Sequence, residues 1–338
     1  MSSGRRVAFP LRPLDVSALS GLAGFPATRR GGRGGPVKAR PATLTPTIPV
    51  GGAFKAVMAA GLAHLLANER GLLEGRDPEY LHQTRVALRR LRSALEVFSP
   101  PLPERVTAAP ARELKQLASR LGPARDWDVF LGETLQPVEA QFGAHRGLKA
   151  FAARCRRLRR GAGAKARGAA HLPRYRQLAL SLSTWLASED WHARLNSGAR
   201  TAMEGPVGDH ARAVLEARYS QVRKRGRGLD NQSAAELHRL RIAIKKFRYA
   251  TDFFAGLYRG TAVGVTLRRL ARLQDILGEM NDAATAPDLV ARGFRRTRGG
   301  DVLEARGILL GWSRSRMAGL KRELGDAWRE FLAAGRFW

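Results

Sequence analysis

The chain has little cysteine, no long uncharged run and few acidic residues. Its single cysteine, Cys155, can form neither an internal disulfide nor a site of several thiolates, which favours a reducing compartment. No uncharged stretch approaches the roughly 20 apolar residues that span a bilayer; the longest, residues 41–54, contains three prolines. Residues 1–25 also lack the continuous apolar core of a secretory signal peptide. We therefore expect a cytoplasmic protein without a membrane span.

Acidic residues are outnumbered two to one by basic residues. The 338 residues include 59 Lys and Arg against 29 Asp and Glu, which gives a net charge of +30 and a pI of about 11.6. Only nine of the cations are lysine, so most are arginine, whose planar fork of donors suits phosphate oxygens. This balance excludes the near-neutral surface of an ordinary cytosolic enzyme and predicts a polyanionic partner. Because 44% of the residues are hydrophobic, the chain also has enough apolar side chains for a folded core.

The first part of the chain differs from the rest. Residues 1–52 are rich in Gly, Pro and Arg, with no period that could bury a face, and we expect them to form a disordered basic leader. A transit peptide or an overlong gene start would have a similar composition. Residues 1–50 carry +7 of the charge, so +23 belongs to the remainder.

From about Phe54 onward the pattern is helical, and strand signals are almost absent. Apolar residues in the stretch 56–73 recur at spacings near three and four, which predicts one helix. Asp77-Pro78-Glu79 supplies an N-cap, a proline at the first helical position and a carboxylate in the first turn, so a second helix begins there. The prolines after Ser99 end it. Further helices are expected at 109–121, 127–143, 145–160, 173–188 and 312–331.

An internal repeat organises these helices. LHQTRVALRRLR (residues 81–92) matches LHRLRIAIKKFR (residues 237–248) without a gap, at an offset of 156 residues. Five further residues keep the same offset: Leu114, Leu117, Leu121, Gly122 and Asp126 meet Leu270, Leu273, Leu277, Gly278 and Asp282. We predict an all-α protein of two pseudo-symmetric units, residues 53–205 and 206–338, each a bundle of about four helices.

Each repeated helix carries a stripe of cations beside an apolar face. On a helical wheel the first stripe contains His82, Arg85, Arg89 and Arg92, and the second contains His238, Arg241, Lys245 and Arg248. Arg90 and Lys246 lie off the stripes but on the same polar side. An ordinary solvated helix face mixes charge signs, because like charges three or four residues apart repel. Two stripes of cations therefore predict a bound anion.

The two histidines, His82 and His238, admit two interpretations. Each could be a core residue satisfied by a neighbouring carbonyl or carboxylate. Alternatively, each could donate to phosphate oxygens in the first turns of its helix, where free backbone N–H groups also favour anions. Neither copy places a second ligand beside the histidine at metal-binding spacing, so we expect no metal site and no cofactor.

The second repeated motif is LGPARD (residues 121–126), matched by LGEMND (residues 277–282). Its predicted role is structural: Gly122 and Gly278 would end a helix in a left-handed conformation, and Asp126 and Asp282 would cap the next one. Four arginines are further candidates for the border of the basic surface: Arg112, Arg125, Arg268 and Arg272.

Together, the two basic motifs and the two Leu-Gly…Asp motifs resemble the CHAD family, the conserved histidine α-helical domain. The resemblance covers roughly residues 54–338 and implies a pair of four-helix bundles that bind inorganic polyphosphate on a basic central surface. It also implies that the cations of both motifs contact phosphate: His82, Arg85, Arg89, Arg90 and Arg92, with His238, Arg241, Lys245, Lys246 and Arg248. Some members carry a triphosphate tunnel metalloenzyme domain with alternating glutamates, and residues 1–50 offer neither its length nor its acids.

Three hypotheses follow for the function. The first is a non-catalytic module that binds polyphosphate and associates with polyphosphate granules. The second is a protein that binds DNA or RNA without specificity, although no helix-turn-helix, zinc finger or aromatic RNA-binding strand motif is present. The third, a phosphatase or phosphotransferase with His82 or His238 as nucleophile, lacks an adjacent acid and a metal site. We therefore expect a binding protein and not an enzyme.

Overall fold

The computed structural model describes residues 35–75, 77–99, 101–171, 173–188, 190–294 and 299–338. Within these ranges the chain is helical and contains no named strand, as the sequence predicts. In chain order the main helices are α1 (Val50–Ala67), α2 (Glu69–Glu74), α3 (Pro78–Val97), α4 (Glu104–Val129), α5 (Gln136–Phe142), α6 (Arg146–His171) and α7 (Pro173–Ser188). They continue as α8 (Asp190–Ala193), α9 (Ser197–Glu204), α10 (Val207–Arg225), α11 (Ala234–Phe254), α12 (Ala262–Phe294) and α13 (Gly300–Ala333).

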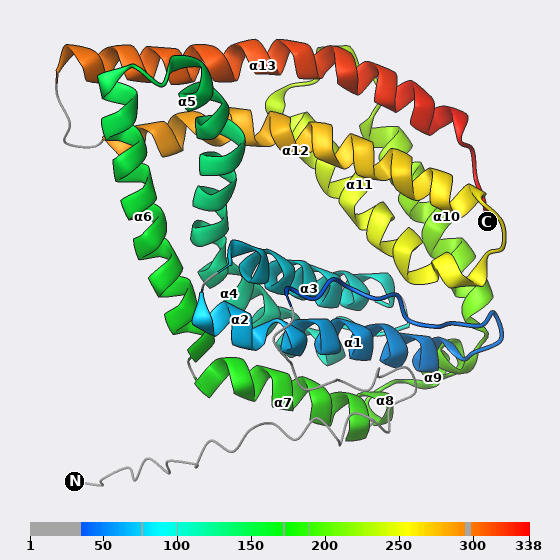
Figure 1. The fold of residues 1–338 in the computed structure, drawn as a ribbon. Coiled ribbons are helices and arrows are strands. Elements are labelled where there is room, and N and C mark those ends of the chain that lie inside the picture. Colours follow the sequence, from blue (N-terminus) through cyan, green and yellow to red (C-terminus); the bar gives the residue numbers. More distant parts are fainter. Residues whose placement is uncertain (1–34, 76, 100, 172, 189, 295–298) are drawn as a thin grey trace, which may run out of the picture.

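The helices form two groups that meet at α3 and α11 (Figure 1). In the first group α3 packs between α1 and α4, with α7 against α1. In the second group α11 packs between α10 and α12, and α13 lies along α12. The long helix α6 stands at one side of the molecule, where it contacts α4 at one end and α13 at the other.

Two apolar clusters hold these groups together. The larger cluster runs through both groups and includes Phe54, Phe98, Phe247 and Phe254, all fully buried. The smaller one joins the end of α4 and the helices after it to the far ends of α12 and α13. Its centre is Phe151 of α6, whose ring stacks on Phe294 with 4.2 Å between centroids. Burial on this scale, at about 25 cal/mol per Å² of apolar surface, drives the folding.

The expected start signals of the two repeated helices are confirmed. Asp77 caps α3 by accepting a hydrogen bond of 2.8 Å from the backbone of Glu79, and Pro78 occupies the first helical position. At α11, Ser233 and Glu236 form a reciprocal capping box. Each cap satisfies backbone N–H groups that the first helical turn leaves unpaired.

The predicted role of the second repeated motif is wrong. Gly122 lies inside α4 and Gly278 inside α12, and neither has a positive φ. Asp126 and Asp282 are therefore mid-helix residues and not caps. The buried faces of these helices, which include Leu121 and Leu277, override the helix-breaking tendency of glycine and of Pro123. After Val129 the chain continues directly into a π-helical turn, η2 (Phe130–Leu135), and then into α5.

The disordered leader predicted for residues 1–52 does not hold beyond residue 34; its earlier part lies outside the described residues. Residues 35–49 run as an extended segment against the fold, and Leu44 is 4% exposed. The buried Asn68 holds this segment: its amide donates 2.9 Å bonds to the carbonyls of Val37 and His64, and its oxygen accepts from the Val37 N–H at 3.0 Å. These side-chain hydrogen bonds hold residues 35–49 in place, although the segment has no periodic pattern of apolar residues.

Three helix lengths also differ from expectation. The helix expected at 56–73 is divided at Asn68 into α1 and α2. Helix α6 continues to His171, and the last helix begins at Gly300, well before the expected residue 312.

Among the described residues, one stretch, Val50–Glu74, is long and apolar enough to cross a membrane, and 67% of its apolar window is buried inside the fold.

The contacts of Asn68 predict that Asn68→Ala will lower the free energy of unfolding by about 1–2 kcal/mol, because the Val37 N–H, the Val37 carbonyl and the His64 carbonyl each lose a hydrogen bond. Urea denaturation measures this change, and faster tryptic cleavage after Lys38 would accompany it. Ser119→Ala is the control, since the Ser119 hydroxyl bonds to the Lys115 carbonyl on an exposed face; it should cost less than about 0.5 kcal/mol. Equal costs would contradict the docking of residues 35–49.

Candidate functional site

The two predicted stripes meet, because α3 and α11 pack directly against each other. Arg89 of α3 donates from Nε to the hydroxyl of Tyr249 on α11 at 3.3 Å. Cations of both helices affect the pKa of Lys245 on α11. Burial lowers its pKa to about 8, and repulsion by Arg241, Arg89 and Arg92 adds to the shift. The structure therefore gathers side chains from the two copies of the motif on one surface.

Two reciprocal ion pairs join α3 to α11. Arg90 of α3 pairs with Asp252 of α11, and Lys246 of α11 pairs with Glu96 of α3, with 2.7 Å between Nζ and Oε2. Arg90 is 9% exposed, and its guanidinium also lies over the ring of Phe253, 5.2 Å from the centroid. Both pairs obey the offset of 156 residues. Arg90 and Lys246, which the resemblance marks as phosphate contacts, thus already have carboxylate partners inside the fold.

The remaining cations of the two stripes have no such partner. Six residues, three from each helix, form no ion pair with any carboxylate in the described part of the chain: Arg85, Arg89, Arg92, Arg241, Lys245 and Arg248. We call these six residues, with His82 and Arg125, the basic surface. Their mutual repulsion is not offset by an internal ion pair, so the surface is arranged to receive anions.

The repeated glycines lie beside two of these arginines. A Cβ on Gly122 would lie 3.3 Å from Nη1 of Arg85, and one on Gly278 would lie 3.8 Å from Nη2 of Arg241. Arg85 also donates from Nη1 to the carbonyl of Ala118 at 3.2 Å. In both arginines Nε is buried without a hydrogen-bond partner. Gly122 thus leaves room for the Arg85 guanidinium, whereas a Cβ at Gly278 would be in ordinary contact with Arg241.

The two histidines have different surroundings. His82 is partly buried, its Nδ1 has no hydrogen-bond partner, and burial followed by repulsion from Arg125 lowers its pKa. His238 is exposed, and its Nδ1 donates to Oδ1 of Asn281 at 3.0 Å. Asn281 stands at the repeat position of Arg125. The side chain beside the histidine is therefore cationic in the first half and a neutral amide in the second.

The chain has a family assignment as well as this geometry. Residues 56–291 match the CHAD domain family. The chain belongs to the CHAD family. A crystal structure of the CHAD domain from the plant Ricinus communis is 33% identical, with a TM-score of 0.76, and the match covers 90% of this chain and 98% of that one. The resemblance seen in the sequence is confirmed.

A second solved structure has the same fold at lower identity. It is PptA from Streptomyces chartreusis, with 20% identity, a TM-score of 0.65, and coverage of 83% of this chain and 100% of that one. At this identity the match shows the CHAD fold alone. No curated protein matches this chain.

The further arginine candidates of this CHAD domain are dispersed. Arg125 is close enough to His82 and Arg85 to influence the pKa of both. Arg112 and Arg268 are exposed on α4 and α12, and Arg272 pairs with Glu330 of α13.

The sequence did not predict Tyr249 as part of this region, because the repeat gives no signal for it. Sequence reasoning assigned no role to Glu96 and Asp252, although these two carboxylates share the repeat offset of Arg90 and Lys246 and could have indicated the cross-pairing.

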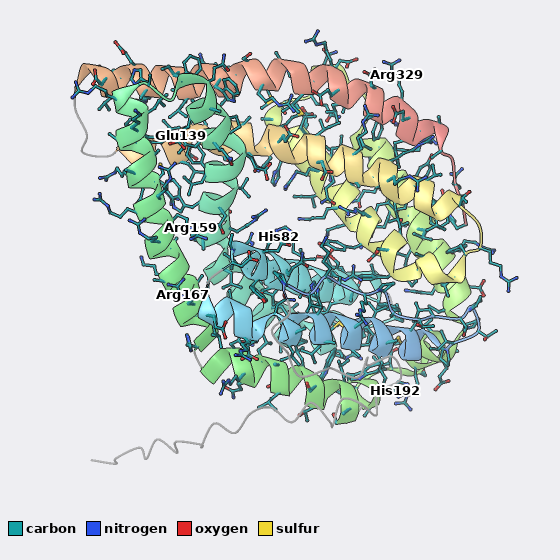
Figure 2. The ribbon with its side chains drawn as sticks, viewed as in Figure 1. His82, Glu139, Arg159, Arg167, His192 and Arg329 are labelled. Atoms are coloured by element: carbon teal, nitrogen blue, oxygen red, sulfur yellow. The ribbon has the colours of Figure 1, made fainter. Side chains whose placement is uncertain are left out.

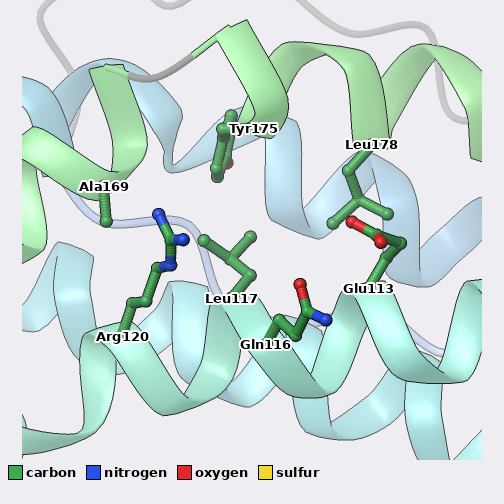
Figure 3. A pocket seen from close by; sticks show the side chains of 7 residues that line it. All are labelled: Glu113, Gln116, Leu117, Arg120, Ala169, Tyr175 and Leu178. Atoms are coloured by element: carbon green, nitrogen blue, oxygen red, sulfur yellow. The ribbon is translucent and has the colours of Figure 1, made fainter.

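The basic surface of this CHAD domain is not an enclosed pocket. A small pocket of about 20 Å³ lies between α4, α6 and α7, and none of the candidate residues lines it (Figure 3). That volume accommodates about one water molecule. Figure 2 places His82 at the beginning of α3, at one end of the basic surface.

The reciprocal pairs predict unequal losses of stability. Asp252→Asn leaves the buried Arg90 without a charged partner and should cost about 2–3 kcal/mol. Glu96→Gln is the matched control from the other half, because the side chains of Lys246 and Glu96 are 34% and 41% exposed; it should cost less than about 1 kcal/mol. Chemical denaturation of the two variants tests this order, and a larger loss in Glu96→Gln would contradict it.

Proposed function

We propose that this protein is a non-catalytic module that binds inorganic polyphosphate along the basic surface. The observation that carries the proposal is the meeting of six unpaired cations, three from α3 and three from α11, on one surface. Membership of the CHAD family supports it, since the family links the chain to polyphosphate binding. We also propose a cytoplasmic location, in association with polyphosphate granules.

The electrostatics favour a long, regularly charged ligand. A chain of phosphates offers acceptor oxygens at every unit, so it can neutralise cations distributed along two crossing helices at once. Binding of this type releases condensed counterions, and affinity then falls steeply as salt rises. Arg85 and Arg241 are candidates for direct contacts, because neither forms an ion pair within the described part of the chain.

We further propose that the two halves are pseudo-symmetric four-helix bundles, which would present the ligand with two similar walls. Two reciprocal contacts support this arrangement. The ion pairs of α3 and α11 exchange partners at the repeat offset. At the starts of α1 and α10, the Val50 N–H donates to the Gly205 carbonyl and the Val207 N–H to the Ile48 carbonyl, both at 2.9 Å. Such exchange is what a two-fold relation produces.

The first test removes one cation from each helix. Arg89→Ala combined with Lys245→Ala should weaken binding of long polyphosphate about tenfold or more, because two charge-assisted contacts are lost. Helicity and thermal stability should be nearly unchanged. Titration calorimetry measures the affinity. The matched control is Lys321→Ala with Arg322→Ala, which removes the same residue types from an exposed face of α13.

Competition separates polyphosphate from nucleic acid as the ligand. We expect the wild-type protein to bind long polyphosphate more tightly than duplex DNA or single-stranded RNA at equal charge concentration and salt. Equal or weaker affinity for polyphosphate would overturn the proposed function. Normal polyphosphate binding by the double variant would place the ligand elsewhere on the protein.

Lys245 predicts a pH dependence with a definite sign. Its pKa of about 8 in the free protein means that the ammonium is mostly charged at pH 7 and mostly neutral at pH 9. A bound polyanion favours the charged form, so binding above pH 8 must take up a proton and affinity falls by about tenfold between pH 7 and pH 9. Lys245→Arg stays charged over this range and should remove the decline. An equal decline in both proteins would contradict the assignment to Lys245.

A further inference from the structure

Helix α6 is unusual in its charge. Its 26 residues include nine cations and no Asp or Glu. At 1.5 Å per residue the helix is about 39 Å long, so the charge extends along one whole side of the molecule (Figure 1). The repeated motifs of the first half end before α6 begins, so the internal repeat does not account for the charge of this helix.

The side of α6 that faces the fold is neutralised by its neighbours. Arg159 pairs with Asp128 of α4 at 2.7 Å, and the Asp128 side chain is 8% exposed. Arg156 pairs with both carboxylate oxygens of Glu139 on α5, at 2.9 and 2.8 Å. The fold therefore supplies a carboxylate where an α6 cation approaches the neighbouring helices.

The outer side of α6 has no such compensation. Five exposed cations form no ion pair with any described residue: Arg146, Lys149, Arg157, Arg160 and Lys165. The other exposed side chains on this side are small: Ala150, Ala153, Gly161, Ala164 and Gly168. The face has no aromatic ring on which a base could stack and no large apolar side chain that could insert into a membrane. Its chemistry fits a phosphate chain that lies close to the helix.

Helix α13 shows how an ordinary solvated face looks in this protein. It carries six cations and five acids, and two of the cations are paired: Arg316 with Glu279 of α12 and with Glu323, and Arg329 with Asp326. The acid-free face of α6 is thus not the general surface composition of the chain. Like charges three or four residues apart on α6, such as Arg157 and Arg160, lower the stability of the helix, and no internal ion pair offsets their repulsion.

Helix α6 lies near one end of the basic surface, through the side on which Arg159 faces the fold. Arg125 belongs to that surface, and Asp128, one helical turn further along α4, holds Arg159 of α6. Figure 2 shows Arg159 and Arg167 along α6, across from His82 at the beginning of α3. A flexible chain that leaves the basic surface at Arg125 therefore meets α6 next.

We propose that the outer face of α6 is a second contact surface, reached by long polyphosphate chains after they have filled the basic surface between α3 and α11. This inference rests on the proposed function. It divides polyphosphate binding into a short-chain part, carried by α3 and α11, and a long-chain part, to which α6 contributes. Engagement of both surfaces by one chain raises affinity through effective concentration, without a second free ligand.

The experiment compares chain lengths in two variants of the full chain. The α6 variant is Lys149→Ala, Arg157→Ala and Arg160→Ala; the control is Lys321→Ala, Arg314→Ala and Arg322→Ala on α13, which removes one lysine and two arginines in both cases. Each protein is titrated with tripolyphosphate, long-chain polyphosphate and duplex DNA over a range of salt. We expect the α6 variant to bind the long chain about tenfold more weakly, with the slope of log affinity against log salt reduced by about two. Tripolyphosphate affinity should be unchanged, and the control should behave as wild type.

Each other outcome overturns the inference in a recognisable way. Unchanged long-chain affinity in the α6 variant makes this face a merely solvated one. Equal weakening for both chain lengths, or in the control as well, indicates a loss of general charge attraction. Loss of duplex DNA affinity with normal polyphosphate affinity makes α6 a nucleic-acid surface. If the wild-type protein binds polyphosphate of neither length, the proposed function itself fails and this inference fails with it.

Discussion

The contact between α3 and α11 determines how the charge of this protein is used. The two helices meet through charged side chains and, at their C-terminal ends, through the rings of Phe98 and Phe254, whose centroids lie 5.9 Å apart. Glu96 and Asp252, near the ends of the two helices, each neutralise one cation of the opposite helix. These two pairs bring the helices together and leave the stripe cations unpaired. The same contact therefore both closes the fold and exposes the surface that we assign to the ligand.

Such a surface costs stability, and the fold compensates elsewhere. The lowered pKa of Lys245 shows that the folded protein disfavours one more charge at this position. The buried aromatic residues on both sides of the contact, among them Phe98 and Phe247, provide apolar burial that outweighs repulsion at the surface. A local conflict that the rest of the fold tolerates is typical of a binding site.

The sequence was most informative where a pattern had local causes. The cap at Asp77 and the cation stripes depend on spacing along one helix, and the structure contains both. Tertiary contacts account for what was mispredicted. Gly122 and Gly278 were assigned to helix ends, because a glycine that lies beside an arginine from another helix has the same local sequence as a cap. The docking of residues 35–49 depends on Asn68, which is more than 30 residues away from Val37. No periodic pattern of apolar residues within the segment predicts this docking.

The two ends of the basic surface are not equivalent, although the helices that build it are related by the repeat. At one end Arg125 lies near His82; at the other, Asn281 takes the place of Arg125 and engages His238. Under the proposed function, the end at His82 therefore offers a polyanion one more cation than the end at His238. The end at Arg125 lies one helical turn from Asp128 and its contact with α6. Under the two proposals, this loss of symmetry at a single pair of positions gives a bound chain a direction, from α11 through α3 and α4 toward α6.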